Sequence, residues 1–131
     1  MLISGDSHGA VKVWNPATGL LIRDIPERHN GFVSSLVLDQ NGLVVSESSD
    51  DRSIKIWDTL NGVCKATLNG LNSGIVCICS LIGGGFATGH EDGKIMRWTL
   101  SATGGSVSIE CSKILKGHTK LVRFVSSLMD D

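Results

Sequence analysis

Three tryptophans recur at nearly equal intervals in this chain, and each ends a similar stretch of sequence. The stretches are SGDSHGAVKVW, SESSDDRSIKIW and TGHEDGKIMRW, which end at Trp14, Trp57 and Trp98 and place the tryptophans 43 and 41 residues apart. Each stretch joins a polar turn to an alternating, strand-like run. A period of about 40–45 residues of this kind is typical of the blades of a β-propeller. The repeat therefore predicts an all-β fold of stacked, four-stranded sheets.

Alternating apolar and polar residues, bounded by Gly, Asn, Asp and Ser, predict strands throughout the chain and no helix. The predicted strands cover residues 2–5, 10–14, 20–25, 32–38, 43–46, 53–57, 63–68, 75–81, 86–88, 94–98, 107–115 and 121–128. Alternation directs Ile54 and Ile56 to one face of their strand and Trp57 to the other. In the third stretch Arg97 replaces the second aliphatic residue, and a sheet covered on both faces would force its charge toward an edge.

Composition argues against several functional classes. The formal charge is −1, from 12 basic and 13 acidic residues, and no basic stripe indicates nucleic-acid binding. The 4 cysteines form no Cys-x-x-Cys motif and no zinc-like spacing, which predicts free thiols in a reducing compartment. No apolar run approaches the roughly 20 residues that span a bilayer, and MLISGD lacks a basic leader. We therefore expect a cytoplasmic or nuclear chain that binds neither a membrane nor nucleic acid.

The repeated stretches resemble the WD-repeat (β-transducin) family of β-propellers. SIKIWD matches the family's Trp-Asp strand fully at Trp57–Asp58, VKVWN and IMRWT keep the Trp, and KGH at 116–118 carries the Gly-His pair. The resemblance implies about three four-stranded blades in one segment, 1–131. The implied repeats cover approximately 1–26, 27–68 and 69–115, with the start of a fourth at 116–131.

The resemblance also implies a structural network in each blade that joins the Gly-His histidine, a Ser or Thr, the turn Asp and the Trp. The candidate members here are Ser4, Trp14, His29, Asp51, Trp57, Thr88, Asp92, Trp98 and His118. In the second copy Glu47 occupies the place expected for the Ser, between Ser46 and Ser48. The third copy has no preceding His, and the first has His8 in place of the Asp. We therefore expect every network to be incomplete and the blades to be less rigid for it.

No arrangement typical of catalysis is found in the sequence, and we expect no catalytic residue, cofactor or metal. Asp50 and Asp51 are adjacent in a turn and point apart, which does not suit a general acid–base pair. GGGFATG at 83–89 lacks the Lys-Ser/Thr of a phosphate loop and enters a strand. An enzyme with a site near the propeller axis remains an alternative, and His8, His90 and Glu91 are its only candidates. Both histidines are expected in or beside tight turns.

The resemblance implies that partner proteins dock on the narrow face that carries the loops between blades. The candidate partner-binding residues are Ser7, Phe32, Ser34, Asp50, Ile75, Glu91 and Arg123. Phe32 is either an exposed anchor or a core residue, and the two acids favour a basic peptide. The predicted function is a non-catalytic scaffold for protein complexes. A substrate-recognition subunit of a ubiquitin ligase, or a phosphopeptide reader, would need an arginine cluster, for which only Arg52 and Arg123 are available.

The strand order leaves the ring open. In the family order the chain opens on the second strand of a blade and closes on a lone first strand at 121–128. About 4–8 blades are needed to close a propeller, so three leave an arc with apolar faces at both ends. Three alternatives follow. The chain is a piece of a longer propeller, a second copy closes a six-bladed ring, or another WD-repeat protein supplies the rest.

Overall fold

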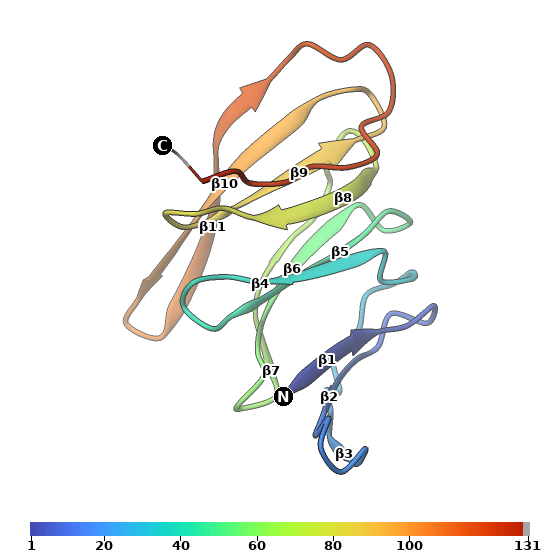
Figure 1. Cartoon of the computed structure of the whole chain (residues 1–131), viewed down its shortest axis with the longest axis vertical. Helices are drawn as coiled ribbons and strands as arrows, with labels where there is room; N and C mark the ends of the chain where they lie inside the picture. Colours follow the sequence, from blue (N-terminus) through green and yellow to red (C-terminus); the bar gives the residue numbers. More distant parts are fainter. Residues whose placement is uncertain (130–131) are drawn as a thin grey trace.

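The computed structural model describes residues 1–129, which form three antiparallel sheets and contain no helix (Figure 1). The first sheet contains β1 (Leu2–Gly5), β2 (Val11–Trp14) and β3 (Leu21–Asp24). The second contains β4 (Ser35–Leu38), β5 (Val44–Ser48), β6 (Ser53–Asp58) and β7 (Val63–Leu68). The third contains β8 (Ile75–Ser80), β9 (Phe86–His90), β10 (Ile95–Thr103) and β11 (Ser106–Leu115). Each sheet is a meander in which consecutive strands are neighbours.

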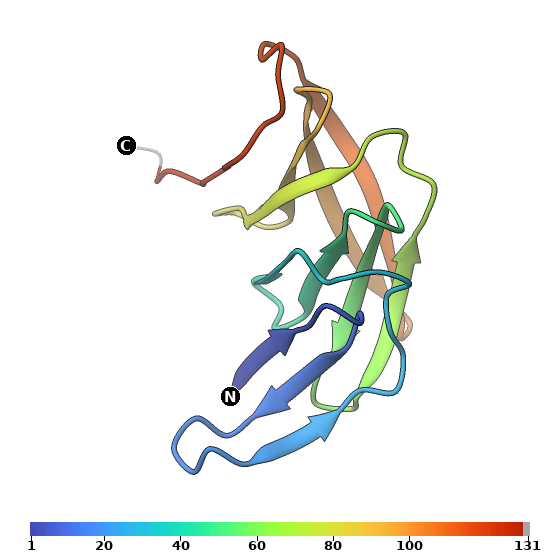
Figure 2. The ribbon, with the colours of Figure 1, turned by 90° about the vertical axis from the view of Figure 1, so that its right-hand side faces the viewer.

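The three sheets follow one another along an open arc. Figure 1 shows them stacked in chain order, and Figure 2 shows that the arc does not close on itself. Within the arc β4 contacts β8 and β7 contacts β11, so equivalent strands of adjacent sheets lie side by side. The all-β prediction is therefore confirmed, and each sheet corresponds to a propeller blade.

The three tryptophans occupy equivalent places in the three sheets. Trp14 pairs with Leu2, Trp57 with Val44 and Trp98 with Phe86, each on the preceding strand. On the other side of each Trp strand the register shifts at the Trp itself. Such a shift marks a β-bulge, which bends and twists the strand locally. The repeat period therefore reflects one sheet geometry used three times.

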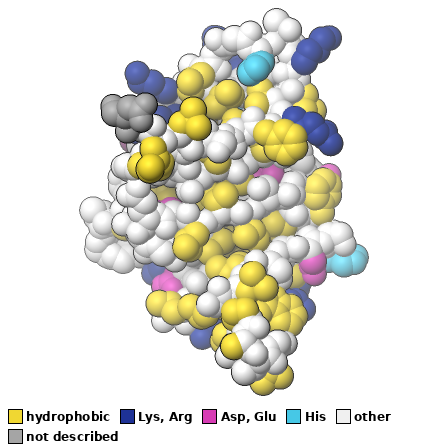
Figure 3. All heavy atoms as spheres, in the orientation of Figure 1, with side chains coloured by type: hydrophobic (Ala, Val, Ile, Leu, Met, Phe, Trp, Pro, Cys, Tyr) yellow, Lys and Arg dark blue, Asp and Glu magenta, His cyan; other side chains and the backbone are white. Residues whose placement is uncertain are grey.

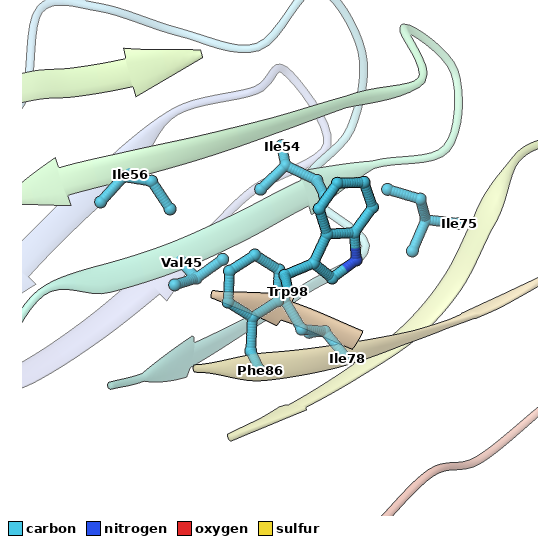
Figure 4. Close-up of a cluster of buried hydrophobic side chains, with 7 residues drawn as sticks. All are labelled: Val45, Ile54, Ile56, Ile75, Ile78, Phe86 and Trp98. Carbon is cyan, nitrogen blue, oxygen red and sulfur yellow. The ribbon is translucent and has the colours of Figure 1, made fainter. Parts of the chain in front are cut away.

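Two apolar clusters hold the sheets together, one in each space between them. The cluster between the first and second sheets contains Val11, Val13, Ile25, Val44 and Trp57. The cluster between the second and third contains Val45, Ile54, Ile56, Ile75, Ile78, Phe86 and Trp98 (Figure 4). Ile54 and Ile56 thus face one neighbouring sheet and Trp57 faces the other, which confirms the predicted alternation. The Phe86 and Trp98 rings stack with centroids 6.1 Å apart.

Two predicted elements differ from the structure. The strand predicted at 121–128 does not form, because this segment meets β8 and β9 mainly through side chains. Among the described residues its one backbone–backbone hydrogen bond runs from the Val122 amide to the His90 carbonyl at 3.1 Å, and the Val122 carbonyl also accepts from the Cys77 thiol at 3.5 Å. The residues after Trp98, predicted as a connection, continue β10 to Thr103 and pair with β11. Residues 130–131, with which the predicted fourth repeat ends, lie outside the described part of the chain.

Candidate functional site

A hydrogen-bonded network crosses the interior of the second sheet. The Trp57 indole Nε1 donates to Ser46 Oγ at 2.7 Å, and Ser46 Oγ lies 2.6 Å from Nε2 of His29. On the other side of the imidazole, His29 Nδ1 lies 3.3 Å from Asp51 Oδ2 and 2.9 Å from Ser53 Oγ. His29, Ser46 and Trp57 are buried. The expectation that every network is incomplete is therefore wrong for this sheet.

The strand register explains why Ser46 completes this network, although the network serine was expected at position 47. Ser46 pairs with Lys55, as Ser4 pairs with Lys12 and Thr88 pairs with Met96. The connection between the paired residues is one residue longer in the second sheet. Counting back a fixed number of residues from the Trp therefore selects Glu47, whereas counting along the ladder selects Ser46.

The geometry assigns the protons of this network. A hydroxyl that accepts from the indole can donate its own hydrogen to His29 Nε2, which leaves Nδ1–H to donate to Asp51 or Ser53. Burial lowers the pKa of His29 against the opposing effect of the Asp51 charge, so the ring is neutral. Burial opposes ionisation of Asp51, but hydrogen bonds from Ser53 and from the Asn30 amide outweigh it and lower the pKa of Asp51.

The third sheet builds a similar network from a different histidine. Trp98 Nε1 donates to Thr88 Oγ1 at 2.8 Å, and Thr88 Oγ1 lies 2.7 Å from Nε2 of His90. His90 Nδ1 lies 3.4 Å from the Ser73 carbonyl. His90 lies beside the β9–β10 turn, as predicted, but it is 2% exposed and burial lowers its pKa, so it is an interior residue. The sequence offered a signal for this, since His90 follows Thr88 by two residues and therefore shares its face of β9.

The remaining candidate network residues are less enclosed. In the first sheet the half-buried Trp14 donates to Ser4 Oγ at 2.8 Å. Asp92 is exposed, accepts a hydrogen bond from the Lys94 amide and pairs with the Lys94 ammonium at 3.1 Å. His118 is exposed. The three sheets therefore differ in how completely their indoles are tied to the rest of the blade.

Glu47 is the most unusual side chain in the interior, and the sequence analysis did not single it out for burial. It is 0% exposed, and neither carboxylate oxygen has a hydrogen-bond partner among residues 1–129. Burial, with a smaller contribution from the Asp51 charge, raises the pKa of Glu47 to about 8. By register Glu47 stands where the other sheets have Gly5 and Gly89. Those glycines are in close contact with Val33 and Val122, which leaves no room for a side chain.

Most of the candidate partner-binding residues lie at one edge of the sheets. This edge carries the β1–β2, β5–β6 and β9–β10 turns and the starts of β4 and β8, and we call it the turn edge. Six of the seven are exposed, namely Ser7, Phe32, Ser34, Asp50, Glu91 and Arg123. Ile75 is a correction: it is 0% exposed because it packs into the core between the second and third sheets. Phe32 is 39% exposed, so the structure favours the anchor over the core residue.

Four of these candidates line one hollow of ≈ 230 Å³ at the turn edge. Its complete lining is Phe32, Ser34, Ser49, Ile75, Val76, Glu91 and Leu121. The residues come from the second sheet, the third sheet and the segment after β11. The hollow therefore exists only because adjacent blades are packed together. Asp50 adjoins it, since its Oδ2 accepts a hydrogen bond from the Phe32 amide at 3.5 Å.

The candidates for a catalytic site do not come together. His8 is exposed in the β1–β2 turn of the first sheet, whereas His90 is buried in the third, and the second sheet lies between them. The Nε2 atom of His90 is already hydrogen-bonded to Thr88 Oγ1. Within residues 1–129, no three His, Cys, Asp or Glu side chains are grouped closely enough to hold a metal ion. No helix of this part of the chain has the length and apolarity needed to cross a membrane.

Comparison with known proteins agrees with the fold. The family model "WD domain, G-beta repeat" matches residues 21–58. Apoptotic protease-activating factor 1 of Rattus norvegicus is 37% identical over 101 residues, which is 76% of this chain and 8% of that protein. DDB1- and CUL4-associated factor 13 of Dictyostelium discoideum is 39% identical over 54 residues, which is 41% of this chain and 12% of that protein. The chain thus spans a small part of these relatives' length.

A solved structure described as "Crystal structure of RRP9 WD40 repeats" superposes with a TM-score of 0.74 at 17% identity. The match covers 91% of this chain and 36% of that one, and it shows the likeness of fold. The equivalent tryptophans, the meandering four-stranded sheets and the matched repeat agree with one another. The chain belongs to the WD-repeat family of β-propellers.

Proposed function

We propose that the chain is a non-catalytic scaffold that binds partner proteins at its turn edge. The observation that carries this proposal is the hollow that Phe32, Glu91 and Leu121 line across adjacent blades. Aromatic side chains that are exposed beside a depression are typical anchors of protein interfaces. Backbone hydrogen bonds next to the two walls, from the Val33 amide to the Asp6 carbonyl and from the Val122 amide to the His90 carbonyl, hold this surface in place. Binding therefore requires little ordering of the chain. Family membership supports the same function, since WD repeats generally serve as interaction scaffolds.

Cross-linking from the anchor position tests this function. We expect Phe32→p-benzoylphenylalanine to cross-link partner proteins in cells, because the side chain at position 32 lies beside the hollow. The matched control is Leu60→p-benzoylphenylalanine. Leu60 is 70% exposed in the β6–β7 turn, at the opposite end of β6 from the turn edge. Mass spectrometry of the adducts gives the readout. Equal cross-linking from both positions would place the interface elsewhere and contradict the proposal.

We also propose that further blades cover the two end faces of the arc, supplied by other WD repeats or by a second copy. Large apolar side chains are exposed at both ends (Figure 3), including Leu2, Leu20 and Ile22 on the first sheet and Ile114, Leu115 and Phe124 near the other end. Apolar surface of this extent favours association. A second copy would give six blades, a number within the range of about 4–8 that closes a propeller.

Sedimentation equilibrium separates these two sources of blades. If a second copy closes the ring, the purified chain is expected to have twice its monomer mass of 13.9 kDa at micromolar concentration. The expected cause is that one dimer buries the exposed apolar side chains at both ends of each arc. A single species of 13.9 kDa would exclude closure by a second copy, and other WD repeats would remain as the source of the further blades.

Cytoplasm or nucleus is the proposed location, because the four cysteines are free, as is usual in reducing compartments. Relatives include proteins named nuclear distribution protein PAC1 and pre-mRNA-splicing factor cwf17.

An arginine cluster of the kind that a phosphopeptide reader needs is not favoured by the geometry. Arg52 lies in the β5–β6 turn, whereas Arg123 lies in the segment after β11.

A further inference from the structure

The hollow at the turn edge lies beside a position where one blade lacks the side chain that its neighbours have. The segments that enter the innermost strands read HNGFV at 29–33, LNSGI at 71–75 and HTKLV at 118–122. Their first residues take equivalent places, since the His29 amide bonds the Gly9 carbonyl and the Leu71 amide bonds the Arg52 carbonyl in equivalent turns. Phe32, Gly74 and Leu121 are then equivalent. Gly74 leaves a gap between two large apolar side chains.

The gap has apolar walls and one carboxylate at its rim. Phe32 and Leu121 stand on either side, 39% and 44% exposed, and Ile75 and Val76 form the floor. A Cβ atom at position 74 would lie 2.7 Å from the Glu91 carboxyl carbon, so the carboxylate lies directly over the glycine. The Glu91 amide also donates to the Gly74 carbonyl at 3.0 Å, which fixes the backbone of Glu91 at this place.

Charges around the hollow favour a cation. Glu91 is exposed and makes no ion pair with another described residue, while Asp50 adjoins Phe32 and adds a second exposed acid near the hollow. Two basic residues, Lys120 and Arg123, lie next to and two positions beyond Leu121, and neither lines the hollow. A second hollow beside the β9–β10 turn contains Asp92 and Lys94, but these two pair with each other and leave no free charge.

We infer that this hollow receives a lysine or arginine side chain of a partner protein. The hydrocarbon stem packs between Phe32 and Leu121 while the charged group bonds the Glu91 carboxylate. Long basic side chains bury their stems against apolar surface and keep the charged group at its edge, which matches this order of walls and acid. A charge-assisted hydrogen bond is roughly twice as strong as a neutral one, so Glu91 supplies the preference for a cation. The inference rests on the proposed function of the turn edge.

Titration of the ¹⁵N-labelled chain with four peptides tests the inference. The peptides are acetyl-Gly-X-Gly-amide, with X as arginine, lysine, norleucine or glutamate. We expect the arginine and lysine peptides to shift the Gly74, Glu91 and Leu121 amides in a saturable way, about fivefold more tightly than norleucine. The glutamate peptide is expected to leave these amides unchanged. Glu91→Gln is expected to reduce arginine binding to the norleucine level, whereas the exposed Glu110→Gln on β11 changes nothing.

Filling the gap separates this inference from the proposed function. Gly74→Leu installs the side chain that the equivalent positions suggest, and the atoms nearest to its Cβ belong to the flexible end of Glu91. We expect it to abolish binding of both the arginine and norleucine peptides while the circular dichroism spectrum is unchanged. Equal binding of norleucine and arginine overturns the inference and leaves an apolar docking surface. If partners still cross-link from position 32 when Gly74→Leu is added, the inference is overturned and the scaffold is upheld. If no partner cross-links from position 32 while Gly74 is retained, the proposed function itself is removed.

Discussion

Glu47→Gln is expected to make the chain more stable at alkaline pH, by on the order of 4 kcal/mol. The carboxyl group is buried between the second and third sheets, and its oxygens find no hydrogen-bond partner among the described residues. Burial raises its pKa from 4.5 to about 8. Between these pH values the folded chain keeps a proton that the unfolded chain releases. The contribution of Glu47 to the free energy of unfolding therefore falls as the pH rises from about 4.5 to about 8, and is constant above that.

Urea unfolding from pH 5 to pH 9, in the presence of a reductant, measures this effect. At pH 5 the wild type and Glu47→Gln should be similar, because a protonated carboxyl and an amide have similar sizes. The difference should then grow through neutral pH. Burial lowers the pKa values of His29 and His90, so both histidines reduce stability as the pH falls below about 6.5. That contribution is common to both proteins and cancels in the difference.

The control for Glu47 is Glu110→Gln, which changes an exposed carboxylate on β11 and should leave the pH profile as in the wild type. Parallel profiles for the wild type and Glu47→Gln would mean that Glu47 ionises freely in the folded chain. The buried position of its carboxyl group would then be incorrect.

Ser46→Ala is expected to lower the free energy of unfolding by about 2–4 kcal/mol. The substitution leaves both the Trp57 indole N–H and His29 Nε2 without their partner in the interior. Each buried polar group left unsatisfied costs about 1–3 kcal/mol. Trp57 and His29 are 0% and 3% exposed, so water cannot easily replace the hydroxyl. Urea unfolding, followed by tryptophan fluorescence and by circular dichroism, gives the measurement.

Ser48→Ala is the matched control, because Ser48 lies on the same strand and is equally buried. Its hydroxyl has no hydrogen-bond partner among residues 1–129, so removing it should leave stability unchanged or raise it. Similar losses for both variants would show that bulk, and not the network, explains the effect of Ser46→Ala. Ser4→Ala should show a smaller loss than Ser46→Ala, since Trp14 is only half-buried.

The architecture was predictable because blades repeat, whereas the differences between blades were not. The spacing of Trp14, Trp57 and Trp98 indicates sheets of equal size, and alternation assigns the face of each strand residue. A fixed spacing from the Trp, however, assumes turns of equal length. One additional residue between Ser46 and Lys55 shifts the network from the expected position to Ser46. The sequence alone cannot choose between Ser46 and Ser48 as the network serine, because both neighbours of Glu47 are serines. The pairing of β5 with β6 makes the choice.

The candidate site was predictable in part for a related reason. Asp50 and Glu91 are charged residues of turns at the edge of the sheets, so their exposure was predictable without knowledge of how the sheets pack. The burial of Ile75 depends on the third sheet packing against the second, which is a contact between residues distant in sequence. The hollow likewise joins residues of adjacent blades, and it lies beside Gly74, which is equivalent to Phe32 and Leu121. The equivalence of these three positions is recognised only when the segments at 29–33, 71–75 and 118–122 are aligned by their places in the structure.

The origin of each histidine has a consequence for the order in which the blades assemble. In the third sheet the members of the network lie close in sequence, with 10 residues from Thr88 to Trp98 and 2 from Thr88 to His90. In the second sheet His29 must cross 17 residues to reach Ser46 and 22 to reach Asp51. Closing a short loop sacrifices less chain entropy than closing a long one. The third sheet can therefore link its indole to its histidine within a single hairpin. The second sheet bonds Trp57 to Ser46 within a hairpin as well, but it must recruit His29 from outside its own strands.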